Sequence, residues 1–134
     1  MKLLRKFSNA SLGVVRLRAL YENGIRLGFG AMGEVTLSDG ANISWDMSLG
    51  YDFVVTLEGN RTLDNPINVK VGQKGRLRVV QDGTGTRTLS FGTSYEFEGG
   101  IAPSISTTAS AEDILYYDCI SATRILIHFV GSIS

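Results

Sequence analysis

The chain of 134 residues contains one cysteine, one histidine and two prolines. A single cysteine excludes an intrachain disulfide framework. Cys119 lies in the apolar run ILYYDCI, which indicates a small buried side chain rather than a nucleophile. His128 lies in a second apolar run, ILIHFV, which favours a structural side chain on a strand. One histidine and one cysteine supply too few partners for a zinc site or a catalytic triad. We therefore expect no catalytic residue, no metal ligand and no cofactor.

The sequence also lacks net charge and long hydrophobic runs. Thirteen basic and thirteen acidic residues cancel, so no overall field attracts nucleic acid or an anionic membrane, and copies of the chain associate easily. No run approaches the ~20 apolar residues that span a bilayer. The basic start, MKLLRKFSNAS, is not followed by the apolar stretch of a secretory signal. These absences predict a protein made in a cytoplasm, with neither nucleic acid nor a membrane as its partner.

Glycine is abundant, with sixteen copies, and separates short runs rich in valine, isoleucine, leucine, threonine and aromatic residues. Such runs at regular spacing predict an all-β fold. Several runs alternate with period 2, as half-buried strands do: Leu77 and Val79 face one way, and Arg76 and Arg78 the other. We expect an antiparallel β-sandwich, of which a jelly roll is one form, because no run reads as the crossover helix that parallel strands usually need.

The domain organisation follows from the same pattern. Residues 1–11 are expected to form an N-terminal arm, and residues 12–134 a single β-sandwich domain. Glu22–Gly24 and Asp39–Gly40 predict hairpin turns, because Asn-Gly and Asp-Gly suit the positive φ that tight turns require. The segment Ala109–Asp113 is the best candidate for a short helical turn.

Two glycine-rich stretches invite a nucleotide-binding interpretation. GFGAMG, residues 28–33, matches a dinucleotide fingerprint, and Asp52 follows at about the spacing of a ribose-binding carboxylate. However, EVTLSDG follows the motif and alternates like a strand, whereas the fingerprint needs a helix there. VVQDGTGTRTLSFG, residues 79–92, lacks the lysine and the helix of a phosphate-binding loop. We expect it to be a corner that pairs residues 77–81 with residues 87–91.

Three further groups of side chains could form a functional site. Glu96 with Glu98, and Glu112 with Asp113, are carboxylate pairs. Glu96 and Glu98 would share one strand face, as the two acids of a retaining glycosidase could, although solvated acids are the commoner case. A local basic patch suggests a solvated edge or an intersubunit salt-bridge surface, with nucleic-acid binding as the weaker alternative because no aromatic side chains are interleaved; it comprises Lys70, Lys74, Arg76 and Arg78. Aromatic side chains offer either core packing or a sugar platform; they are Trp45, Tyr51, Tyr95, Tyr116 and Tyr117.

Residues 35–134 resemble a domain of structural proteins from tailed bacteriophages and prophages. The resemblance rests on an ordered series of segments: ISWD, VTLEGNRTL, GQ, QDGTGTRTLSFG, a stretch of the form GG-APS-STTA, and DILYY. It implies a β-rich virion component without catalytic residues. By analogy with such domains, it also implies a homotrimer.

The short β-domain with a basic arm has no shaft and no collagen-like repeat, which favours a capsid decoration, cement or head-fibre protein that stabilises the shell through subunit contacts. Its partners would be other copies of the chain and the major capsid protein or other virion proteins. A tail or tail-fibre component is the alternative within this class. From another class, a carbohydrate-binding module for host adhesion would use exposed aromatics such as Trp45 or Tyr95.

Overall fold

The computed structural model describes residues 33–133. The chain divides into two units, Met1–Gly33 and Glu34–Ser134, and the description below concerns the second. The predicted arm 1–11, the first strand 12–21, the Glu22–Gly24 turn and most of the GFGAMG motif lie outside the described residues. Gly33, the last residue of that motif, leads directly into a strand rather than a helix. The chain after the motif therefore lacks the helix that a dinucleotide fingerprint requires.

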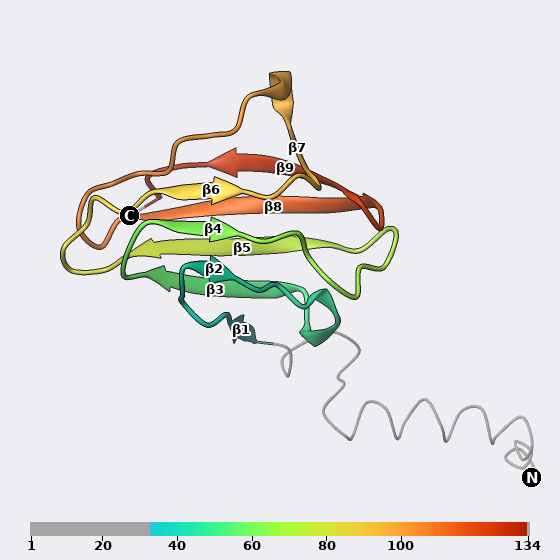
Figure 1. The fold of residues 1–134 in the computed structure, drawn as a ribbon, viewed down its shortest axis with the longest axis horizontal. Helices are drawn as coiled ribbons and strands as arrows, with labels where there is room; N and C mark the ends of the chain where they lie inside the picture. The colour runs from blue at the N-terminus through green and yellow to red at the C-terminus, as the bar shows by residue number, and fades with distance from the viewer. Residues whose placement is uncertain (1–32, 134) are drawn as a thin grey trace, which may run out of the picture. The chain divides into compact units, whose positions relative to one another are not determined.

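The described residues form nine strands and two short 3-10 helices (Figure 1). In chain order they are β1 (Glu34–Thr36), β2 (Asn42–Ile43), η3 (Met47–Leu49), β3 (Asp52–Leu57), β4 (Arg61–Leu63), β5 (Lys74–Gln81), β6 (Leu89–Phe91), β7 (Tyr95–Phe97), η4 (Glu98–Gly100), β8 (Glu112–Ser121) and β9 (Arg124–Val130). The all-β prediction is confirmed. The short helical turn expected at Ala109–Asp113 is wrong, because Glu112 and Asp113 begin β8. None of the helices among the described residues has the length and apolar character to cross a membrane.

The first six strands alternate between two sheets. β1, β3 and β5 pair in parallel in the large sheet, and β2, β4 and β6 pair in parallel in the small sheet. The chain thus winds three times through both sheets, as in a β-solenoid, and each turn of the chain places its strands beside those of the previous turn. We call one such turn a coil. A strand in the facing sheet replaces the crossover helix that the sequence interpretation required.

A hairpin then extends the large sheet. β8 lies antiparallel to β5, β9 lies antiparallel to β8, and β7 pairs in parallel with the outer side of β9. The resulting six-stranded sheet has the order β1-β3-β5-β8-β9-β7 and is mixed. The antiparallel arrangement expected from the sequence is therefore wrong for most of the described pairings, whereas the two last apolar runs, β8 and β9, do pair in antiparallel.

The core lies between the two sheets. Inward side chains of the large sheet alternate with outward ones, so that Leu77 and Val79 are buried while Arg76 and Arg78 face outward, as predicted. The small sheet contributes Ile43 and Leu63. The remaining fully buried large side chains include Trp45, Met47, Phe53, Val55, Leu57, Leu115, Ile125 and Ile127. Each fully buried aliphatic side chain stabilises the fold by about 1.5–3 kcal/mol.

The glycine-rich stretch at residues 82–88 connects β5 of the large sheet to β6 of the small sheet. The predicted hairpin between these strands is wrong, because β5 pairs with β3 and β8, and β6 pairs with β4. The stretch is nevertheless a corner. The Asp82 carboxylate accepts hydrogen bonds from the backbone N–H groups of Thr84 and Gly85, at 3.1 and 3.0 Å. Gly85 has a φ of +74°, and a Cβ there would lie 2.6 Å from the Thr107 carbonyl oxygen.

Asp39–Gly40 is likewise a corner rather than a hairpin turn, because it joins β1 to β2 in the facing sheet. The Asp39 carboxylate accepts two hydrogen bonds from the Arg61 guanidinium, at 2.8 and 2.6 Å. Arg61 opens β4, so the ion pair ties the corner of the first coil to the second coil. The pKa of Asp39 is lowered, chiefly by this hydrogen bond.

Candidate functional site

The cysteine and the histidine lie in different surroundings. Cys119 is buried, its Sγ lies 3.4 Å from Met47 Sδ, and burial raises the pKa of its thiol. A buried, protonated thiol is a poor nucleophile. His128 faces outward from β9, where its Nδ1 lies 3.0 Å from Glu98 Oε1. His128 therefore forms an exposed contact with η4 and lies on a strand, as expected.

The four carboxylates considered as acid–base pairs contact other residues. Arg124 donates two hydrogen bonds to Glu96, at 2.8 and 3.0 Å, and holds the pKa of that carboxyl below its usual value. A glycosidase general acid needs a raised pKa, so Glu96 does not suit that role. Glu112 and Asp113 point to opposite sides of β8. Glu112 accepts a hydrogen bond from Arg78 on the outer face, whereas buried Asp113 accepts hydrogen bonds from Ser106 and Ser132.

The aromatic side chains separate into core and surface. Trp45 has no exposed surface, and it contacts the rings of Phe53, Tyr95 and Tyr117. Tyr95 is also buried, and its hydroxyl donates to the Asp64 carbonyl at 2.5 Å. The suggestion that Trp45 or Tyr95 forms a sugar platform is therefore wrong, because neither ring reaches the surface. Tyr51 and Tyr116 are exposed.

The outer face of the large sheet is the side turned away from the small sheet, and it carries most of the charged side chains of the predicted basic patch. Lys74, Arg76 and Arg78 project from β5 onto this face, while Lys70 lies in the preceding loop. Arg78 donates to Glu34 of β1 at 2.8 and 2.9 Å and to Glu112 of β8 at 3.0 Å, which raises the pKa of its guanidinium. Most of the positive charge on this face is thus balanced within the chain.

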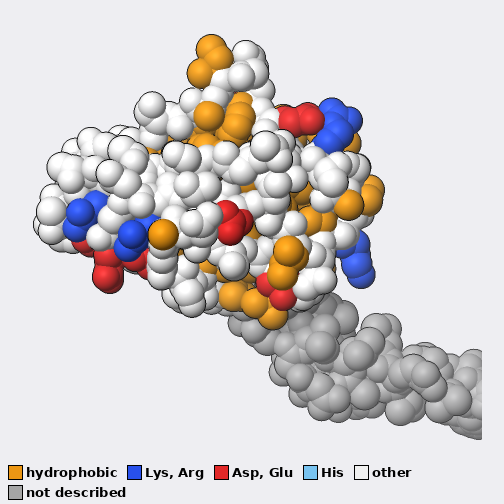
Figure 2. Space-filling model, in the orientation of Figure 1, with side chains coloured by type: hydrophobic (Ala, Val, Ile, Leu, Met, Phe, Trp, Pro, Cys, Tyr) orange, Lys and Arg blue, Asp and Glu red, His pale blue; other side chains and the backbone are white. Residues whose placement is uncertain are grey.

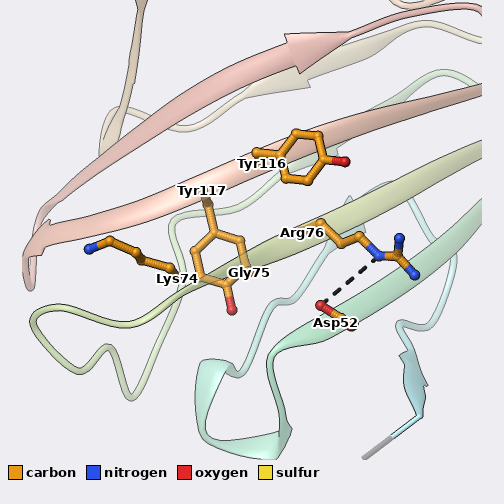
Figure 3. Close-up of a pocket in the computed structure, with 6 residues that line it drawn as sticks. All are labelled: Asp52, Lys74, Gly75, Arg76, Tyr116 and Tyr117. Carbon is orange, nitrogen blue, oxygen red and sulfur yellow. Dashed lines mark ion pairs between the residues drawn. The ribbon is translucent and has the colours of Figure 1, made fainter.

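A shallow hollow of about 400 Å³ lies on this face at the start of β5 (Figure 3). It is lined by Asp52, Lys74, Gly75, Arg76, Tyr116 and Tyr117. In Figure 3, Tyr116 lies beside Arg76 on the neighbouring strand, and the Arg76 side chain extends toward Asp52. Sequence reasoning named these side chains separately, as basic patch and aromatic residues. The antiparallel register of β5 and β8, which opposes Arg76 to Tyr116, brings them together.

A second surface feature is a group of apolar side chains at one end of the described domain, where η3 and the β4–β5 loop lie (Figure 1). It consists of Leu49, Tyr51, Ile67 and Val71, which are 49–68% exposed. We call it the corner patch. Figure 2 shows exposed hydrophobic side chains at this end, on the right, and also at the top and in the middle of the view, while the left end is mainly polar.

The loops that carry the corner patch are held by hydrogen bonds. The Ile67 backbone bonds the backbone of Met47 and Trp45 at 3.0 and 2.9 Å. The Gln73 side chain donates to the carbonyl oxygens of Met47 and Gly50 at 3.0 and 2.9 Å. The exposed aliphatic side chains are thus presented by a fixed backbone. Several large apolar side chains exposed at one end of a domain are typical of a surface that contacts other proteins.

Comparison with known proteins gave no assignment: no family model, no curated protein and no solved structure matches this chain. Within the described residues, no group of three or more histidine, cysteine, aspartate or glutamate side chains is arranged to hold a metal ion.

Proposed function

We propose that the chain is a non-enzymatic structural component of a bacteriophage particle. Within that class, we favour a capsid decoration, cement or head-fibre protein, made in the bacterial cytoplasm and incorporated into the virion. The corner patch is the observation that carries the proposal, because its side chains are large, mainly apolar and exposed on loops held by hydrogen bonds. The resemblance of residues 35–134 to phage structural domains supports the same class.

The corner patch would act by burying its apolar side chains against a second copy of the chain. Full burial of one such side chain yields about 1.5–3 kcal/mol, so four would form the apolar centre of a stable contact. A standard interface buries about 800 Å² on each partner. The equal numbers of basic and acidic residues leave no net repulsion between copies. By analogy with virion β-domains, the assembly would be a homotrimer.

The mass of the whole chain in solution tests self-association through the corner patch. We expect wild-type protein to elute as an oligomer in size-exclusion chromatography with light scattering. The double variant Ile67→Asp and Val71→Asp should be a folded monomer, because two charges would be desolvated in the contact. Ile101→Asp is the matched control, since Ile101 is 78% exposed but lies after η4 rather than in the patch. A monomeric wild type, or an oligomeric double variant, would contradict the proposal.

The location in the particle requires a separate measurement. A decoration protein should co-purify with phage heads at hundreds of copies for each particle, whereas a tail or tail-fibre component should be present at a few. Quantitative mass spectrometry of purified particles distinguishes the two. Absence of the chain from purified particles would exclude both locations.

A further inference from the structure

Arg76 differs from every other arginine among the described residues. Each of the other four donates at least two hydrogen bonds to carboxylate oxygens, at 2.6–3.3 Å; they are Arg61, Arg78, Arg87 and Arg124. The carboxylate oxygens nearest to the Arg76 guanidinium are 3.7 Å away in Glu34 and 4.0 Å away in Asp52. Its Nε is buried and has no hydrogen-bond partner within residues 33–133. The Arg76 side chain as a whole is 37% exposed, so the outer nitrogens of its guanidinium, rather than the buried Nε, retain donors for a ligand.

The hollow beside Arg76 adds two further kinds of contact. Tyr116 lies opposite Arg76 in the register of β5 and β8, and the residue is 44% exposed. An exposed ring face packs against the C–H groups of a sugar in the way that aromatic rings pack on apolar surfaces. Asp52 is half exposed at the edge of the hollow and accepts hydrogen bonds from hydroxyl groups. A volume of about 400 Å³ lies within the range of small-ligand sites.

The charges around the hollow limit the class of ligand. Lys74 and Arg76 attract an anion, but Glu34, Asp52 and Asp118 lie close to them and repel a polyanion such as nucleic acid. A ligand with one carboxylate and several hydroxyl groups satisfies both sets of side chains. Its carboxylate accepts two hydrogen bonds from the planar guanidinium, and its hydroxyl groups donate to Asp52. The side chain of a glutamate in a partner protein offers no donor for Asp52.

We propose that this hollow binds a hexuronic acid, either free or as one unit of an acidic polysaccharide. Arg76 holds the carboxylate, the Tyr116 ring packs against the sugar ring, and Asp52 accepts from a hydroxyl group. The hollow shares no lining residue with the corner patch, and glucuronate binding and self-association are measured separately, so failure of one proposal is distinguishable from failure of the other.

Titration of the isotopically labelled full chain with D-glucuronate, followed by NMR, tests the site. We expect shifts of the backbone amides of Lys74, Arg76 and Tyr116 that saturate with glucuronate. D-glucose and acetate, which offer only the ring or only the charge, should each bind at least about tenfold more weakly, since a bidentate pair and a ring contact are each worth more than 1 kcal/mol. Equal affinity for glucose, or equal affinity for acetate, would overturn the proposal.

Substitutions of the proposed contact residues test which side chains bind glucuronate. Arg76→Gln and Tyr116→Ala should each weaken glucuronate binding by about tenfold or more. Arg124→Gln is the matched control, because Arg124 projects from the same sheet but is hydrogen-bonded to Glu96, and it should bind like the wild type. Arg76→Lys retains the positive charge but lacks the planar guanidinium, so it should also bind glucuronate weakly. This variant keeps the test valid if Arg76→Gln fails to fold. Wild-type affinity in Arg76→Lys and Tyr116→Ala, or tighter binding of a triglutamate peptide than of glucuronate, would overturn the proposal.

Discussion

At the scale of single residues, the corner at Asp82 shows how one carboxylate organises a glycine-rich stretch. The Asp82 carboxylate accepts hydrogen bonds from two backbone N–H groups and from the Arg87 guanidinium, whose nearest nitrogen is 2.7 Å away. These contacts, led by the hydrogen bond from Arg87, lower the pKa of Asp82 from 3.8 to about 2. The charged form is therefore favoured in the folded protein.

This lowered pKa predicts a pH dependence of stability. The contribution of the Asp82 carboxylate is fully present above its unfolded pKa of 3.8 and is lost as the pH falls toward about 2. Asp82→Asn should therefore lower the midpoint of thermal unfolding at pH 6, and the difference from wild type should shrink between pH 4 and pH 2. A difference that stays constant over that interval would show that the charge of Asp82 is not involved.

The residues of the candidate site show the limit of sequence reasoning at this scale. Asp118 is the one charged side chain of the run ILYYDCI and shares a face with Tyr116, so period-2 alternation points Tyr117 toward the core, but it does not show which neighbouring strand lies beside either ring. The structure buries Tyr117, whose hydroxyl donates to the Tyr51 carbonyl at 2.9 Å, and exposes Tyr116. Burial raises the pKa of Tyr117 to about 12. The sequence identified Arg76 as outward-facing, but its weak pairing depends on the three-dimensional positions of Glu34 and Asp52.

At the scale of elements, the start of β5 requires a residue without a side chain. A Cβ on Gly75 would overlap the Tyr51 carbonyl oxygen and lie 2.7 Å from the Tyr117 hydroxyl. Gly75→Ala should therefore destabilise the protein by about 1–3 kcal/mol, the usual cost of overpacking. Gly83→Ala is the matched control, because a Cβ there meets nothing within 4 Å, and it should change stability by less than about 0.5 kcal/mol.

Chemical denaturation of wild type and both variants measures these differences. Equal stabilities for Gly75→Ala and Gly83→Ala would show that Tyr51 and Tyr117 move aside at little cost.

The elements themselves were largely predictable, but their partners were not. The alternation of Phe53, Val55 and Leu57 is a local property with period 2 that can be read from the sequence, and the structure buries these three side chains. Strand pairing is non-local. An Asp-Gly corner between two sheets and an Asp-Gly hairpin within one sheet use the same turn residues, so the motifs at Asp39 and Asp82 did not distinguish them. The parallel direction follows only once the strands are known to alternate between sheets.

At the scale of the whole molecule, the coils and the final hairpin share one core. The only tryptophan, Trp45, packs against Phe53 of β3, Tyr95 of β7 and Tyr117 of β8. Its ring therefore joins residues that are distant in the chain. Leu77 of β5 lies fully buried in the strand that pairs with both the second coil and the hairpin.

This shared core predicts that residues 34–133 unfold together. Leu77→Ala should lower the free energy of unfolding by about 2–5 kcal/mol, and it should shift the transitions measured by tryptophan fluorescence and by far-UV circular dichroism equally. Thr56→Ala, on the exposed outer face of β3, serves as the control and should stay within about 0.5 kcal/mol of wild type. Separate transitions for the two probes would mean that the coils and the hairpin melt independently.

The winding of β1 to β6 also has an evolutionary consequence. Each coil adds one strand to each sheet and presents the next coil with an equivalent pair of strand edges. Duplication of a gene segment that encodes one coil, such as residues 34–51, would lengthen both sheets by about 4.8 Å and would require no new kind of contact. Proteins of different length can therefore arise from this architecture through gain or loss of whole coils.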